Sequence, residues 1–466
     1  MPSKKRRRRG KRLPEEPVEV EITGLSSEGR GIAHIDERTV FVDQALAGER
    51  VLFKYTRLSK NIAEGRTVEV LQASDQRVRP KCKAFEMCGG CSLQHMSSEM
   101  QVKLKQDMLL DQLKHNGVEP EEVLEPLLGP EFGYRTKARL GVRYVNKKEK
   151  VLVGFRERGS SFITDTERCE VLHPSVGEIL EELAECINQL EARRTIAQIE
   201  VAVGDNQTVL VFRHLEPLVD EDRTILADFC RSRSLVCYLQ AGKPDDLELL
   251  VPEQVEALHY YLPDRGPDCG PGGEPDMQHG KKFPDLKIEF QPADFTQVNP
   301  EINKRMVANS IDFLDLQESD RVLDLFSGLG NFSLAMARHC QQVTAVEGSL
   351  VMVKKARDNA ALNDIDNVEF IYADLYSDEV LSAPWLKQKY DKILLDPPRS
   401  GAAAIIPALK KMQAKAIVYV SCHPATLARD AAVLVNDLGY KLKKAGIMNM
   451  FPHTGHVESI AVFEKK

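Results

Sequence analysis

A regular alternation of predicted strands and helices, from Lys287 to the C-terminus, restricts the fold of this 466-residue chain most. "RVLDLFSGLGNFSLAMARHC" is predicted to form a strand, a glycine turn and a helix, and further strands are predicted in "QQVTAVEGS", "VEFIYADL" and "YDKILLDPPRSG". Strands that alternate with helices form a mainly parallel sheet, which binds ligands beyond the carboxyl ends of its strands. Residues 287–466 are therefore predicted to form a Rossmann-like α/β domain with a ligand site at one sheet edge.

Acidic residues end three of these strands, and a glycine turn ends the first. Residues 324–330, "DLFSGLG", let the backbone turn tightly and approach a ligand closely. Glu347 is placed to accept hydrogen bonds from both hydroxyls of a ribose, Asp374 to meet an adenine edge, and Asp396 ends the fourth strand. Any one acid could simply cap a helix, but the set indicates a nucleoside site. The turn lacks the G-x-G-x-x-G spacing of pyrophosphate-binding loops, so S-adenosylmethionine (SAM) is predicted rather than NAD.

A cysteine, Cys422, follows the next predicted strand in "VYVSCHPATLARD" and precedes a helix. A thiolate that adds to carbon 6 of uracil gives carbon 5 the carbanion character that methyl transfer requires. The helix N-terminus is expected to lower the pKa of this thiol. Glu458, in "FPHTGHVESIAVFE", is the candidate base for the carbon 5 proton. The simpler alternatives are that Cys422 is only a small buried residue and Glu458 only an exposed strand acid. Beside a SAM site, the two residues together favour catalysis over these alternatives.

A second group of cysteines indicates a metal site. Cys82, Cys88 and Cys91 in "KCKAFEMCGGCSLQHM" have the spacing C-x5-C-x2-C, and thiolates this close in sequence indicate a bound metal or cluster. Cys169, in "TERCEVLHP", is the best candidate for the fourth ligand. The spacing suits zinc as well as an iron–sulfur cluster, so it leaves the metal open.

The N-terminal part differs in character from the C-terminal domain. Residues 1–13 form a tail with eight basic residues in "KKRRRRGKR", predicted to be disordered and to contact nucleic acid. Residues 14–75 alternate apolar and polar residues between turn residues, which predicts a five-stranded OB-like β-barrel. Residues 76–286 are predicted to form a mixed α+β central domain that contains the cysteine group. A helix is predicted over residues 97–116, where it could pack on the C-terminal domain.

Five motifs resemble those of the RNA uracil-C5 methyltransferase family. They are "DFTQVNP", "DLFSGLGNFS", "LLDPPRSGA", "SCHPATLARD" and "PHTGHVES", and they cover nearly all of the C-terminal domain. The resemblance implies that Cys422 is the nucleophile and Glu458 the base. It also implies contacts with SAM or the target base from Gln297, Phe326, Asn331, Glu347, Asp374 and Asp396. His423 departs from the family, which usually has Asn after the catalytic cysteine.

The N-terminal barrel resembles a TRAM domain, an RNA-binding barrel, through "GLSSEGRGIA". Resemblance to the family also implies that Cys82, Cys88, Cys91 and Cys169 hold a [4Fe-4S] cluster, to which we assign a structural role. A barrel, a cysteine group and a catalytic half together resemble the branch of the family that forms 5-methyluridine in 23S rRNA. The expected partner is therefore 23S rRNA, either naked or in a pre-ribosomal particle.

Three alternatives to this function stay open at the sequence level. The chain could be a tRNA enzyme or a dual-site rRNA enzyme of the same family. It could also be a non-catalytic iron–sulfur protein that binds RNA or assists ribosome assembly. No apolar run approaches membrane-spanning length and no secretory segment is evident, so a cytoplasmic protein without membrane contact is expected. We expect a monomer, because the RNA supplies the extended partner surface.

Overall fold

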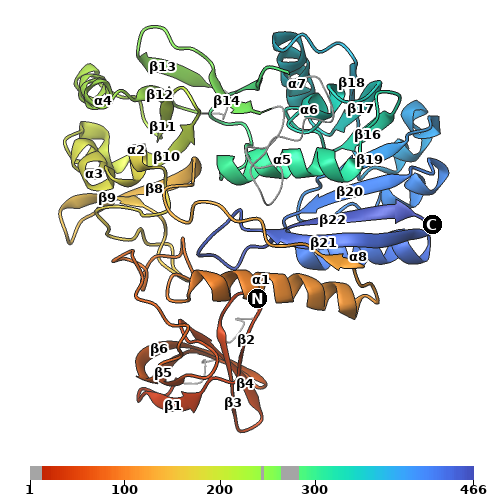
Figure 1. Ribbon diagram of the computed structural model, residues 1–466. Coiled ribbons are helices and arrows are strands. Elements are labelled where there is room, and N and C mark those ends of the chain that lie inside the picture. Colours follow the sequence, from red (N-terminus) through yellow and green to blue (C-terminus); the bar gives the residue numbers. More distant parts are fainter. Residues whose placement is uncertain (1–12, 243–245, 264–282) are drawn as a thin grey trace, which may run out of the picture. The chain divides into compact units, whose positions relative to one another are not determined.

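A computed structural model describes residues 13–242, 246–263 and 283–466 of the chain (Figure 1). Nearly all of the predicted basic tail, and residues 264–282 of the predicted central domain, lie outside the described residues. The chain divides into two compact units, which are described separately below. The first unit comprises residues 1–105 and 453–455, and the second comprises residues 106–452 and 456–466.

A six-stranded sheet forms most of the first unit. Its strands are β1 (Val18–Glu21), β2 (Gly24–Leu25), β3 (Gly31–Ile35), β4 (Arg38–Asp43), β5 (Arg50–Leu58) and β6 (Ile62–Gln72), in the spatial order β1-β5-β6-β4-β3-β2. The sequence predicted five strands; the additional β2 is only two residues long, too short to give a visible alternation. Apolar side chains, Val51 and Phe53 among them, fill the interior. Glu49 is completely buried and accepts two hydrogen bonds from Arg77, at 2.5 and 2.7 Å.

Helix α1 (Ser98–His115) occupies the span in which the sequence predicted a helix. The part that belongs to the second unit begins at Gln106, whose side chain accepts a hydrogen bond from the backbone of Ile447 at 3.1 Å. The same side chain donates to the carbonyl of Leu124 at 3.2 Å. This part of the helix therefore packs on strand β21 (Tyr440–Met448) and on the segment around β7 (Glu122–Val123), which lies at the edge of the C-terminal sheet.

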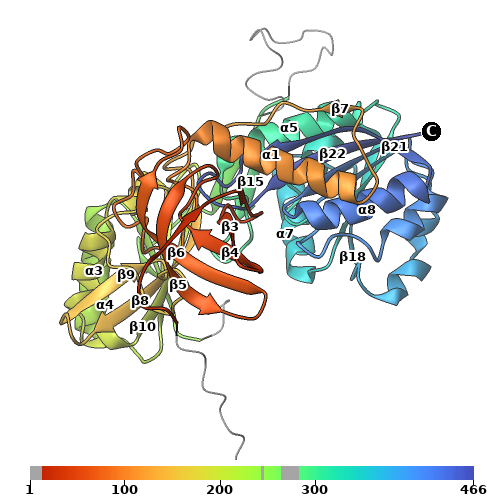
Figure 2. The ribbon, with the colours of Figure 1, turned by 90° about the horizontal axis from the view of Figure 1, so that it is seen from below.

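The second unit contains a central α+β region and the C-terminal domain (Figures 1 and 2). The central sheet has the order β13-β12-β11-β10-β8-β9. Its strands are β8 (Lys137–Val145), β9 (Lys150–Gly154), β10 (Ile196–Val203), β11 (Thr208–His214), β12 (Val236–Gln240) and β13 (Leu247–Val251). Helices α3 (Leu180–Asn188) and α4 (Asp220–Ser232) bury their apolar sides against this sheet. Strand β14 (Leu258–Leu262) pairs with β15 (Leu286–Phe290) and leads into the C-terminal domain.

The C-terminal sheet has eight strands in the order β18-β17-β16-β19-β20-β22-β21-β7. Strands β16 (Arg321–Leu325), β17 (Gln342–Glu347), β18 (Val368–Tyr372), β19 (Lys392–Leu395) and β20 (Ala416–Ser421) are parallel. The last strand, β22 (Glu458–Lys465), runs antiparallel between β20 and β21. The associated helices are α5 (Pro300–Leu314), α6 (Ser333–Ala337), α7 (Leu350–Leu362) and α8 (Pro424–Asn436).

The strand order of this sheet identifies where a ligand should bind. From β16 the chain proceeds to β17 and β18 on one side, and then to β19 and β20 on the other. Such a switch in direction leaves a crevice at the carboxyl ends of the first strands of each half. Among the described residues, no helix has both the length and the apolar character needed to cross a membrane.

Candidate active site

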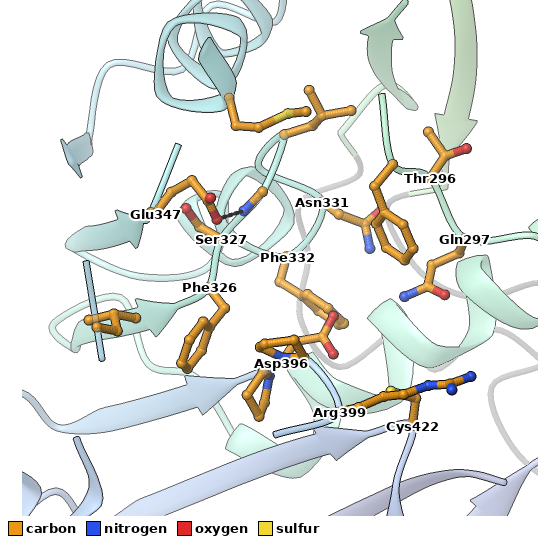
Figure 3. A pocket seen from close by; sticks show the side chains of 18 of the residues that line it. Thr296, Gln297, Phe326, Ser327, Asn331, Phe332, Glu347, Asp396, Arg399 and Cys422 are labelled. Atoms are coloured by element: carbon orange, nitrogen blue, oxygen red, sulfur yellow. Dashed lines mark hydrogen bonds between the residues drawn. The ribbon is translucent and has the colours of Figure 1, made fainter. Parts of the chain in front are cut away.

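A pocket of about 630 Å³ opens at this switch point, beyond the carboxyl ends of β16, β17, β19 and β20 (Figure 3). All of the residues predicted to bind SAM or uracil line it, and so do both predicted catalytic residues. They are Gln297, Phe326, Asn331, Glu347, Asp374, Asp396, Cys422 and Glu458. The fold thus brings together eight residues that are spread over 162 positions of sequence, from 297 to 458.

The glycine turn after β16 shapes one side of the pocket. Phe326, Gly328 and Gly330 all have positive φ angles, of 69°, 55° and 90°. A Cβ atom at position 330 would lie 3.1 Å from the side chain of Leu334, so a larger residue would disturb helix α6. Phe326 has a left-handed backbone conformation, which residues other than glycine, Asn and Asp adopt rarely and which is typical of strained functional sites.

Glu347 is fixed by the same turn. One carboxylate oxygen accepts a hydrogen bond from the backbone N–H of Gly328 at 3.0 Å, the dashed line in Figure 3. The other oxygen accepts one from Ser349 N–H at 2.9 Å. Each carboxylate oxygen can accept two hydrogen bonds, so both keep the capacity to accept a ribose hydroxyl.

Asp324, the first residue of the glycine motif, lies beneath the turn and is completely buried. Burial raises the pKa of its carboxyl to about 7, and the hydroxyl of Ser333 in α6 donates a hydrogen bond to it. It is absent from the described lining of the pocket, so its contact with α6 gives it a structural role. Asn331, which does line the pocket, is held by two hydrogen bonds between its side-chain amide and that of Asn303, at 3.0 and 3.1 Å.

Cys422 directly follows β20, and His423 begins helix α8 as its N-cap. The expectation that the helix would lower the pKa of this thiol is wrong, because the pKa is raised to about 11. Burial is the largest cause, and the negative charges of Glu458 and Asp396 add to it, whereas Arg399 opposes them. His423 Nδ1 accepts a hydrogen bond from Thr426 N–H at 3.4 Å, and an Asn side chain can cap a helix in the same way.

Glu458 is the first residue of β22 and is 3% exposed. The antiparallel register pairs Ser421 with Ser459, so Cys422 and Glu458 occupy the next facing positions at the ends of adjacent strands. Burial raises the pKa of Glu458 well above its ordinary value, and the charge of Asp396 raises it further. The pKa of Asp396 is itself raised to about 7, first by burial and then by Asp324. The nucleophile candidate therefore lies beside acids that resist ionisation.

Several lining residues were not found from the sequence. Arg399 is the only Arg or Lys among the described residues that line the pocket, and Figure 3 shows it next to Cys422. Phe295 is 74% exposed at the pocket. Tyr376 hydrogen bonds to Ser400 and to the carbonyl of Gly401, both at 2.8 Å. Tyr260 comes from β14, and its hydroxyl donates to Asn331 at 2.9 Å; only the fold could reveal this long-range contact.

The cysteine group of the first unit lies in a loop of tight turns. Cys82 and Cys88 are half-buried and Cys91 is buried. The backbone N–H of Gly90 donates to the sulfur of Cys88 at 3.4 Å, a contact that also stabilises thiolate ligands. Cys169, in the second unit, is half-buried. Within the described ranges, no cluster of three or more His, Cys, Asp or Glu side chains has the arrangement of a metal site.

Comparisons with known proteins agree with the chemistry of the pocket. Residues 281–466 match the family model described as tRNA (Uracil-5-)-methyltransferase, and residues 11–68 match the TRAM domain model. The 23S rRNA (uracil(1939)-C(5))-methyltransferase RlmD of Alcanivorax borkumensis is 48% identical over 459 residues, which cover 98% of this chain and 99% of that protein. The protein of the same description from Francisella tularensis subsp. novicida is 46% identical over 466 residues, with 99% of each chain covered.

A solved structure is similar in fold. It is the crystal structure of the Pyrococcus abyssi tRNA (uracil-54, C5)-methyltransferase in complex with S-adenosyl-L-homocysteine. The TM-score is 0.70 and the sequence identity is 23%, with 96% of this chain and 100% of that chain covered.

Proposed function

Because this chain belongs to the RNA uracil-C5 methyltransferase family, we infer that it transfers a methyl group from SAM to carbon 5 of a uracil in 23S rRNA. The relatives are named for uracil 1939, and we propose the equivalent uracil as the target. The observation that carries the proposal is the placement of Cys422 and Glu458 at facing strand ends, in the pocket that Glu347 and Asp374 also line.

The reaction uses these side chains in a fixed order. The thiolate of Cys422 forms a bond to carbon 6 of uracil, and the displaced electron pair makes carbon 5 nucleophilic. Carbon 5 then takes the methyl group of SAM as the S–CH3 bond breaks, and the sulfur keeps that electron pair, which leaves S-adenosylhomocysteine. Glu458 removes the carbon 5 proton, and the electrons of the broken C–H bond expel the Cys422 thiolate and restore the double bond. A raised pKa suits Glu458 for this step, because the ionised carboxylate is then a stronger base than an ordinary glutamate.

The test uses an RNA in which the last step, loss of the carbon 5 proton and release of Cys422, cannot occur. A 23S rRNA fragment with 5-fluorouridine has no carbon 5 proton, so methyl transfer should leave it attached to the protein. Mass spectrometry should locate the methylated adduct on Cys422. Cys422→Ser should form no adduct, and the matched control Cys340→Ser, which changes a buried cysteine outside the described pocket lining, should form it normally.

The same assay separates the alternatives. An adduct with a tRNA, or at a second rRNA site, would indicate a tRNA or dual-site enzyme. No adduct with any of these RNAs, in protein that binds SAM, would favour the non-catalytic RNA-binding protein. On natural uridine, Glu458→Gln should transfer the methyl group and then accumulate the adduct. Normal turnover by Glu458→Gln would mean that another group is the base.

We also propose that Cys82, Cys88, Cys91 and Cys169 hold a [4Fe-4S] cluster with a structural role. Support comes from the four thiol donors, the C-x5-C-x2-C spacing and the N–H directed at the Cys88 sulfur. Iron and acid-labile sulfide should both be present in protein purified without oxygen, and Cys88→Ser should lose them. Cys186→Ser, at a buried core cysteine, should retain them. Zinc without sulfide would identify a zinc site instead.

We propose that the protein works in the cytoplasm as a monomer, with the TRAM barrel and the basic tail attached to the rRNA. When Lys and Arg side chains neutralise RNA phosphates, bound counterions are released, so the affinity for RNA falls as the salt concentration rises. Removal of residues 1–12 should therefore weaken rRNA binding and flatten its salt dependence. The same binding assay with naked 23S rRNA and with pre-ribosomal particles identifies which form is the substrate.

A further inference from the structure

We propose that residues 133–136, here called the bridging segment, position the parts of the pocket that lie outside the parallel strands. In this proposal, Tyr134 is a positioning residue for the pocket segment that leads to Glu458, and Thr136 is one for the segment that carries Gln297. The inference rests on the proposed function, because it concerns the same pocket. It assigns a role in the reaction to residues that do not touch the reacting atoms.

The first observation is a hydrogen bond over a long sequence separation. Tyr134 is 4% exposed, and its hydroxyl donates to the carbonyl of Pro452 at 3.1 Å. Phe451 precedes Pro452 and lines the pocket, as does His456, and the rings of Phe451 and His456 lie 5.6 Å apart, edge to face. Because Pro452 connects strand β21 to this part of the pocket, the Tyr134 hydroxyl fixes the backbone from which the segment departs.

The second observation concerns the opposite wall. The backbone N–H of Thr136 and its hydroxyl both donate to the carbonyl of Val298, at 3.0 and 3.2 Å. Val298 follows the three lining residues Phe295, Thr296 and Gln297. The side chain of Lys137, next along the chain, donates to the carbonyl of Pro292 at the start of this loop. Two adjacent residues thus hold the loop 292–298 near both of its ends.

The third observation is that the bridging segment is itself held on its other side. Residues 133 and 135 donate backbone hydrogen bonds to the carbonyls of residues 170 and 171, both at 2.9 Å. The N–H of His173 donates to the carbonyl of Arg135, also at 2.9 Å. After Thr136 the chain continues as β8, which lies between β10 and β9 in the central sheet. The segment is therefore anchored in the central region, and Tyr134 and Thr136 donate hydrogen bonds to the backbone next to the two pocket segments.

Loss of the Tyr134 hydroxyl should displace pocket residues without unfolding the protein. Tyr134→Phe removes one oxygen atom and leaves the ring in place, so the fold should be retained. The carbonyl of Pro452 loses its donor, so the backbone at the start of the pocket segment loses one of its fixed points. Misplacement of a reacting group by about 1 Å can lower a rate by about 100-fold. Glu347, held by the glycine turn, is not affected by this change.

The test compares Tyr134→Phe with the matched control Tyr390→Phe. Tyr390 is 3% exposed, and its hydroxyl also donates to a backbone carbonyl at 3.1 Å, that of Trp385, outside the described pocket lining. We expect Tyr134→Phe to lower kcat by about 10-fold or more, with KM for SAM changed less than about 2-fold, and to accumulate the methylated adduct on natural uridine. The control should do neither. Equal behaviour of the two variants would overturn the role of Tyr134.

A second pair of variants tests the other wall without RNA. Thr136→Val removes the hydroxyl that donates to Val298, and Thr136→Ser keeps it. Binding of S-adenosylhomocysteine, measured by calorimetry, should weaken by about 3- to 10-fold in Thr136→Val, which corresponds to the loss of one hydrogen bond, and should be rescued in Thr136→Ser. Equal affinity in both variants would refute this part of the proposal. Because the readout needs no RNA, its result stands even if 23S rRNA is not the substrate.

Discussion

The raised pKa of Cys422 leads to a prediction about thiol reactivity that needs no RNA. Burial and two neighbouring acids move this pKa from 9.0 to about 11. At any pH well below 9, a pKa of about 11 instead of 9.0 lowers the thiolate fraction about 100-fold. The remaining thiolate is more nucleophilic, because nucleophilicity rises with pKa with a Brønsted slope of about 0.4–0.5. This raises the reaction rate of each thiolate by a factor of about 6 to 10. The net effect is alkylation about 10- to 16-fold slower than that of an ordinary thiol.

The assay is alkylation by iodoacetamide over a range of pH, followed at the Cys422 peptide by mass spectrometry. The midpoint of the rate profile is more informative than the rate, because it reports the pKa independently of access. We expect the rate to rise about tenfold per pH unit up to a midpoint near 11. Glu458→Gln should lower the midpoint by removing a negative charge, and Arg399→Met should raise it by removing the positive one.

The structure also predicts how the thiol changes when the pocket is filled. SAM carries a positive sulfonium, and S-adenosylhomocysteine has nearly the same shape without the charge. If both bind in the pocket, SAM should lower the Cys422 midpoint more than S-adenosylhomocysteine does. A midpoint of 9 or below in the free protein, or one that does not respond to Glu458→Gln, would refute the reasoning. It would mean that the helix N-terminus, and not burial, controls this thiol.

Two further predictions concern stability. The pKa of Asp324 is raised from 3.8 to about 7, so its contribution to the free energy of unfolding is present below pH 4 and is lost as pH rises to 7. Asp324→Asn should remove this loss, which is about 1.4 kcal/mol per pH unit within that window, as measured by urea unfolding. An unchanged slope of stability against pH would contradict the raised pKa. Arg77→Met should destabilise the barrel by about 3–5 kcal/mol, because it leaves the buried carboxylate of Glu49 without an opposite charge. Arg50→Met breaks an exposed pair with Glu19 and should cost less than about 1 kcal/mol by the same measurement.

The composition of the pocket could be predicted well from the sequence, for a topological reason. Parallel strands end at one edge of a sheet, so residues that follow successive strands must lie close together whatever their separation in sequence. Glu347, Asp374 and Asp396 were placed by this rule alone. Tyr260 and Tyr134 could not be placed, because their contacts cross from the central region and leave no local pattern.

The pKa of Cys422 shows the other limit of sequence reasoning. A cysteine before a helix predicts stabilisation of the thiolate by the helix N-terminus, which is a local effect. The structure adds burial and the two acids Asp396, directly after β19, and Glu458, at the start of β22. These are tertiary effects, and together they raise the pKa of the thiol. The cysteine group is different again. Its spacing predicts ligands of a metal or cluster, and this remains a prediction.

The antiparallel direction of β22 explains how the nucleophile and the base come together. In a purely parallel sheet, only the residues after each strand reach the ligand edge, and the first residue of every strand lies at the far edge. Because β22 runs the opposite way, its first residue, Glu458, reaches the ligand edge beside Cys422. Backbone pairs from Ala416–Glu464 to Ser421–Ser459 fix this register. A slip of one residue would turn Glu458 to the other face of the sheet, so the pairing of these two strands determines whether the base can reach the carbon 5 proton.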